Sequence, residues 1–119
     1  MTPAAIVHAW LAAVNAADAD AVLALSAPDI AMIGPRGTAT GHEVLRGWLQ
    51  HAGATFETLA TCARGDSVVV AQRGVWPGGG DAVEVATRFR VAGGRVAELQ
   101  RYDGLADALR AAGLTRADA

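Results

Sequence analysis

The spacing of the hydrophobic residues changes near the middle of this 119-residue chain. In the first half, apolar residues recur at helical spacing, as in Ile6, Val7 and Trp10. From Thr55 onward they alternate with polar residues, which is typical of strands. When the helices precede the strands along the chain instead of alternating with them, the helices pack as one layer against the sheet. The sequence therefore predicts an α+β domain of two layers.

Short local signals predict where the helices begin and end. Thr2 offers a hydroxyl cap and Pro3 suits the first position of a helix, so the first helix begins there. Asp18 can cap a second, short helix, and we expect Pro28 to end it because the residue before a proline is pushed out of the α region. Gly41–Gly53 frames a third helix.

The second half predicts a meander of about four long strands. A short strand at 30–33 comes before it, and the meander itself covers 55–63, 67–76, 82–91 and 95–103. A last helix is expected at 105–112, ending at Gly113. We therefore expect one domain over residues 1–114 and a polar tail at 115–119.

Composition narrows the class of protein. The net charge is −2 and the ten basic residues form no run, so nucleic acid is not an expected partner. All ten are Arg, which together with the excess of Ala is typical of a GC-rich bacterial genome. Cys62 is the single cysteine, which indicates a reducing compartment, and no basic leader or membrane-length apolar run is visible. We expect a cytoplasmic protein that does not bind membranes.

The run from Asp29 to Gly37, DIAMIGPRG, followed by a helix that starts at Gly41, carries a family resemblance. With two helices before it and strands after it, this order resembles the cone-shaped family of nuclear transport factor 2, ketosteroid isomerase and the SnoaL-like polyketide cyclases. The resemblance covers nearly the whole chain. It implies a curved, mostly antiparallel sheet with three N-terminal helices on its concave face, a short C-terminal helix, and an apolar cone between these layers.

The resemblance also implies which side chains line the cone. The expected lining residues are Trp10, Met32, Gly34, Trp48, Val70, Gln72, Val85, Thr87, Phe89, Leu99, Arg101 and Asp103. The alternation in 82–91 independently places Val85, Thr87 and Phe89 on one face. Both faces of the last strand carry a similar mixture of polar and apolar residues. Which of its faces lines the cone is therefore inferred from the resemblance alone.

The match to the isomerase fails at its catalytic residues. That enzyme places its base Asp just before the proline, where this chain has Gly34. Its oxyanion hole combines a Tyr and a protonated carboxylic acid, and the matching residues here are Trp10 and Thr87. Glycine moves no proton, an indole N–H only donates, and a Thr hydroxyl does not titrate near neutral pH. We expect no Δ5-3-ketosteroid isomerase activity.

Arg101 and Asp103 are the candidate catalytic pair. They are two apart on one expected strand and so share a face, which faintly resembles the Arg/Asp arrangement of limonene epoxide hydrolase. Asp103 would act as the base, and Arg101 would position it or serve as the electrophile. The alternative is structural, with Asp103 capping the last helix and Arg101 in an ion pair.

Two classes of function stay open on the sequence. The first is binding of a small, largely apolar organic molecule in the cone, and the second is an enzyme of isomerase, cyclase or epoxide hydrolase type. We expect no cofactor and no metal site, since the histidines at 8, 42 and 51 lack ligand spacing. A homodimer is expected through the exposed sheet face, whose small or apolar residues are Ser67, Val69, Ala71, Ala82 and Ala86.

Overall fold

The computed structural model describes residues 1–119, apart from the side chains of His51 and Ala52. The helices are α1 (Pro3–Asn15), α2 (Ala19–Ala24), α3 (His42–Ala52), α4 (Leu105–Ala112) and the 3-10 helix η1 (Arg116–Asp118). The strands are β1 (Ser26–Gly34), β2 (Gly37–Thr40), β3 (Thr55–Arg64), β4 (Ser67–Val75), β5 (Val83–Ala92) and β6 (Arg95–Tyr102).

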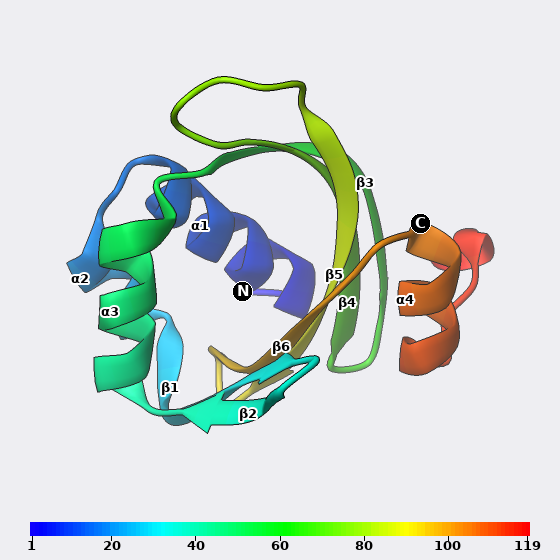
Figure 1. Ribbon diagram of the computed structural model, residues 1–119. Coiled ribbons are helices and arrows are strands. Elements are labelled where there is room, and N and C mark those ends of the chain that lie inside the picture. Colours follow the sequence, from blue (N-terminus) through cyan, green and yellow to red (C-terminus); the bar gives the residue numbers. More distant parts are fainter.

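The six strands form one curved sheet in the order β2-β1-β6-β5-β4-β3. Strands β3 to β6 are the expected antiparallel meander, while β1 joins the sheet by pairing parallel to β6. Figure 1 shows α1, α2 and α3 inside the curve of the sheet and α4 on its outer side. The predicted α+β architecture, with three N-terminal helices on the concave face, is confirmed.

The expected capping residues act as predicted. The Thr2 hydroxyl accepts a hydrogen bond from the Ala5 amide at 3.1 Å, and the Asp18 carboxylate accepts one from the Ala21 amide at 3.2 Å. Gly53 ends α3 with a φ of 58°, in the left-handed region that glycine tolerates. Within the described part of the chain, none of the helices combines the length and apolar character that crossing a bilayer requires.

The predictions around β1 were wrong in two places. Helix α2 ends at Ala24, so Pro28 does not end it but lies inside β1. The pairing of β1 with β6 shifts register between Ser26 and Ala31, and a proline is tolerated at such an irregularity because no ladder hydrogen bond is lost. Strand β2 was not expected at all. Its residues are all exposed, so no hydrophobic alternation marks it.

The C-terminal residues are not only a polar tail. Thr115 and Asp118 form a reciprocal capping box that closes η1, with the Thr115 amide donating to the Asp118 carboxylate at 2.8 Å. Arg64 of β3 donates a hydrogen bond to the Gly113 carbonyl and lies 3.8 Å from Asp118. The end of the chain is therefore docked on the outer side of β3.

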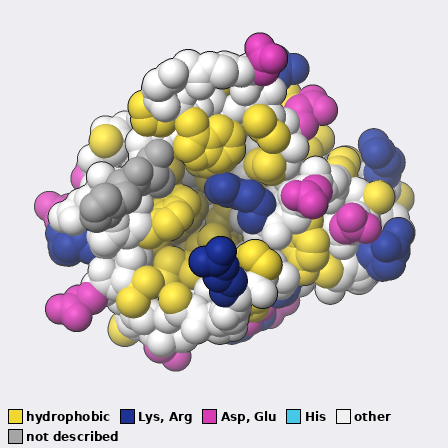
Figure 2. Space-filling view, in the orientation of Figure 1, with side chains coloured by type: hydrophobic (Ala, Val, Ile, Leu, Met, Phe, Trp, Pro, Cys, Tyr) yellow, Lys and Arg dark blue, Asp and Glu magenta, His cyan; other side chains and the backbone are white. Residues whose placement is uncertain are grey.

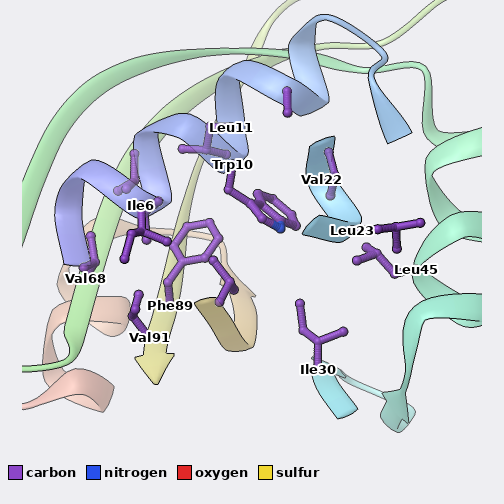
Figure 3. Close-up of a cluster of buried hydrophobic side chains, with 14 residues drawn as sticks. Ile6, Trp10, Leu11, Val22, Leu23, Ile30, Leu45, Val68, Phe89 and Val91 are labelled. Carbon is purple, nitrogen blue, oxygen red and sulfur yellow. The ribbon is translucent and has the colours of Figure 1, made fainter. Parts of the chain in front are cut away.

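The main core lies between α1, α2, α3 and the concave face of the sheet. Figure 3 shows Trp10 and Phe89 pointing toward one another at its centre. Their ring centroids are 5.6 Å apart with an interplanar angle of 69°, an edge-to-face contact. The rest of the core consists mainly of aliphatic side chains from these elements. This packing fixes α1, and hence one wall of the space that remains open in the cone.

A second, smaller core lies on the convex face beneath α4. It contains Cys62, Val69 and Ala86, packed against Ala108 and Leu109 of the helix. Cys62 is thus a free, buried core residue. Because α4 covers Val69 and Ala86, part of the surface on which the homodimer was expected is already buried within one chain. The homodimer stays a prediction, for which sedimentation is the test.

Candidate functional site

A hollow of about 360 Å³ opens between α1, the end of β1, α3 and β6. We call it the cone pocket, and its lining residues are Trp10, Met32, Ile33, Gly34, Pro35, Leu45, Trp48, Leu99 and Arg101. Figure 2 shows this face hollowed, with hydrophobic side chains on the walls and basic side chains at the rim. Its volume falls at the small end of the range for small-molecule sites.

A small space of about 20 Å³ adjoins the cone pocket, and we call it the inner void. The two share Trp10, Trp48, Leu99 and Arg101 as walls, and we refer to them together as the cavity. The remaining residues of the inner void are Leu11, Val14, Phe56, Gln72, Thr87 and Phe89. The open part of the cavity is thus apolar, and its deep end carries a polar pair.

Trp10 forms an apolar wall of this cavity. Its indole N–H donates to the Ser26 hydroxyl at 2.9 Å, and that hydroxyl donates to the Val22 carbonyl at 2.7 Å. Trp10 is only 2% exposed. Because its single donor is already used, the indole presents only its apolar ring to a ligand.

Gln72 and Thr87 are the buried polar pair. They come from β4 and β5, and the Thr87 hydroxyl donates to Gln72 Oε1 at 2.8 Å. Gln72 is 1% exposed, and its amide nitrogen has no hydrogen-bond partner among the described residues. Among the described residues, Arg88 Nε is the fully buried side-chain polar atom without a partner, so the Gln72 nitrogen retains some accessible surface. Its two N–H groups are therefore available to an acceptor placed beside Gln72.

Arg101 stands where the cone pocket meets the inner void. Its guanidinium carbon lies 5.0 Å from the ring centroid of Phe56 and 5.9 Å from that of Trp76. It makes no ion pair with the carboxylates of the described residues. The side chain still reaches solvent, yet burial against the pocket wall lowers the pKa of its guanidinium below the ordinary value. Arg101 is therefore a partly desolvated cation without a counter-ion.

Asp103 lies outside this cavity. It is exposed and lines a shallow outer groove with Arg101, Gly34 and Asp107. Neither expected structural role of the pair is present. Gly104, not Asp103, is the N-cap of α4, with no side-chain cap, and Asp103 forms no ion pair with Arg101. Whether the two residues are catalytic stays a prediction.

The structure brings most of the expected lining residues together. Those in the cone pocket or inner void are Trp10, Met32, Gly34, Trp48, Gln72, Thr87, Phe89, Leu99 and Arg101. Two others lie elsewhere. Val70 is fully buried in the main core, and Val85 lines a separate groove beside Asp103. Val70 pairs with Thr87 and Val85 pairs with Gln72, so all four side chains lie on the same face of the sheet. Val70 and Val85 stay out of the cavity because of how neighbouring side chains pack around them, not because they point to the other face.

Several residues around the cavity were not expected from the sequence. Phe56 lines the inner void, and Trp76, which lines neither part of the cavity, meets Phe56 edge to face with centroids 5.7 Å apart. Leu45 of α3 is a further lining residue of the cone pocket. The described part of the chain holds no cluster of three or more candidate metal ligands. The side chain of His51 lies outside the described residues.

Gly74 makes room for the two rings behind Arg101. A Cβ atom at this position would lie 2.7 Å from Trp76 and 3.0 Å from Phe56. We expect Gly74→Ala to displace these rings and to lower the free energy of unfolding by about 1–3 kcal/mol, measured by chemical denaturation. Gly34→Ala is the control, because a Cβ there makes only an ordinary contact, 3.8 Å from the Gly37 carbonyl oxygen. If both variants are as stable as the wild type, the close packing of Gly74 against the rings of Phe56 and Trp76 is refuted.

Solved structures with the same architecture define the class of this fold. An NTF2-like protein of unknown function from Cytophaga hutchinsonii superposes with a TM-score of 0.78 at 16% identity, over 86% of this chain and 89% of that one. A Catenulispora acidiphila protein with a ketosteroid isomerase-like fold, solved in complex with trimethylamine, has a TM-score of 0.69 at 28% identity, over 92% and 93%. The fold is therefore the cone-shaped fold of the NTF2-like superfamily.

The chain belongs to the SnoaL-like domain family, whose model matches residues 7–99. Another structure of similar shape is SalBIII, an epoxide hydrolase/cyclase-like enzyme with a role in pyran ring formation in the polyether salinomycin. Its TM-score is 0.76 at 19% identity, over 88% of this chain and 92% of that one. No curated protein matches the chain. Membership of the family confirms the expected resemblance and leaves the reaction open.

Proposed function

We propose that this protein binds a small, largely apolar organic molecule in the cone pocket. The observation that carries the proposal is the cavity itself, in which apolar walls surround very few polar groups. Small-molecule sites have this composition, because apolar contact supplies affinity while a few fixed polar groups orient the ligand. The trimethylamine in the Catenulispora protein supports a ligand-binding role for a fold of this shape.

Binding of a neutral probe to a pocket-filling variant tests this proposal. We expect 1-indanone, a small bicyclic ketone, to bind the wild type saturably in isothermal titration calorimetry. Leu99→Phe narrows both parts of the cavity and should abolish binding, whereas Val44→Phe places the same side chain at an exposed site on α3. The proposal fails if a panel of such neutral compounds shows no binding, or if both variants bind like the wild type.

The second candidate function is enzymatic, with Asp103 as base and Arg101 as its positioning or electrophilic partner. The observation in its favour is that Arg101 lines both the cone pocket and the outer groove that contains Asp103. A substrate in the cone pocket that extended past Arg101 would therefore come near this carboxylate. Reactions of isomerase, cyclase or epoxide hydrolase type all need such a base.

Asp103→Asn tests the enzymatic candidate once a substrate has been found. The variant should abolish turnover and keep ligand affinity within about tenfold, roughly 1.4 kcal/mol, because the amide retains the shape of the carboxylate. Asp107→Asn is the matched control, since Asp107 also lines the outer groove but lies on α4. If Asp103→Asn keeps full activity, Asp103 is not the base.

A further inference from the structure

The polar groups of the cavity are arranged to donate hydrogen bonds rather than to accept them. Arg101 carries up to five N–H donors and no acceptor, and the amide nitrogen of Gln72 adds two N–H groups without a partner. The residues that line the cone pocket and the inner void include no Asp or Glu. An acceptor group on a ligand would thus meet donors, and a cationic ligand would meet a like charge.

Arg101 also differs from most arginines of the chain in having no carboxylate beside it. Six of the ten arginines form ion pairs within the described residues, namely Arg46, Arg64, Arg73, Arg88, Arg90 and Arg110. The other four are Arg36, Arg95, Arg101 and Arg116, and of these Arg101 alone lines the cavity. Its guanidinium lies over the rings of Phe56 and Trp76 while the residue as a whole stays exposed, so an entering anion can reach it.

We infer that the ligand is an organic acid: a flat apolar body in the cone pocket with a carboxylate on Arg101. This inference rests on the proposed function and specifies its ligand class. The fork of the guanidinium suits a carboxylate because two parallel N–H···O bonds can form. The side-chain amide of Gln72 would donate a hydrogen bond to an oxygen of the same carboxylate or to a second acceptor on the ligand. The apolar body would lie against Trp10, Trp48 and Leu99.

The test compares an acid with its neutral amide of the same shape. Titration calorimetry measures trans-cinnamate and trans-cinnamamide against the wild type, Arg101→Met and Arg95→Met. Arg95 undergoes the same charge change at the other end of β6, about 20 Å away at the usual rise of a strand, and has no ion pair among the described residues. Thermal unfolding of each variant shows that it is folded.

We expect the wild type to bind cinnamate at least tenfold more tightly than cinnamamide. Arg101→Met should bring the acid down to the affinity of the amide, while Arg95→Met should keep the preference. Trimethylammonium, which carries the opposite charge, should not bind. Equal affinities of acid and amide for the wild type, or a preference that survives Arg101→Met, would overturn the inference and leave the proposed function standing. If neither compound nor 1-indanone binds, the proposed function fails and the inference with it.

Discussion

Replacing Phe89 by Ala should lower the free energy of unfolding by about 3–5 kcal/mol, the range for large aromatic residues in cores. Phe89 is 1% exposed, lies in the middle of β5 and meets Trp10 edge to face. The substitution loses this contact and leaves a cavity that α1 cannot fill, since α1 is also fixed to Ser26 by Trp10. Equilibrium unfolding in urea gives the value directly.

Phe89→Leu separates loss of volume from loss of the aromatic ring. We expect it to cost less than about 1.5 kcal/mol, because a large aliphatic side chain still fills most of the site. Phe89 also lines the inner void, so the Ala variant enlarges the cavity inward. If Phe89→Ala costs less than about 1 kcal/mol, the described packing of α1 on β5 is wrong, because full burial of an aromatic ring contributes more than that.

Replacing Thr87 by Val should lower the free energy of unfolding by about 1–3 kcal/mol, although the two side chains have nearly the same shape. The Thr87 hydroxyl is the donor to Gln72 Oε1, and both residues are buried. Without it, Gln72 Oε1 loses its hydrogen-bond partner within the described residues. Urea unfolding again gives the measurement.

The double variant Thr87→Val with Gln72→Leu is the matched control. Removing both polar partners together leaves no buried group unpaired, so its stability should return close to that of the wild type or exceed it. Ligand binding should nevertheless fall, because the amide donor of the inner void is gone. If the double variant is as unstable as Thr87→Val, the pair is not the isolated buried network that the structure shows.

The sequence predicted most of the fold because its signals were local. The caps at Thr2 and Asp18 and the terminating glycine at position 53 each act within a few residues, and the structure confirms them. Strand β2 and the start of β1 were missed because tertiary pairing creates them. Ser26 belongs to a strand because it lies beside Val96, which a sequence pattern cannot reveal.

The candidate site was less predictable than the fold. A sequence pattern can indicate which face of the sheet a side chain lies on, but not whether that side chain reaches the cavity. Alternation placed Val85, Thr87 and Phe89 on one face, but only Thr87 and Phe89 reach the inner void. The facing of β6 became clear only through its register, in which Leu99 pairs with Phe89 and Arg101 with Thr87. The pairing of Arg101 with the rings of Phe56 and Trp76 depends on two segments that are far away in the sequence.

Chemical-shift mapping of a bound ligand tests the central claim, that the cone pocket is the binding site. Two-dimensional ¹H–¹⁵N spectra of the protein titrated with 1-indanone report separately on the indole N–H groups of Trp10 and Trp48 and on the side-chain amide of Gln72. All three residues border the cavity. We expect saturable shifts concentrated on these three signals. Gln72 also borders the groove around Leu59 and Asp103, whereas the two indoles do not. Shifts at Gln72 that leave both indole signals unchanged, or the absence of saturable shifts, would therefore contradict this binding site.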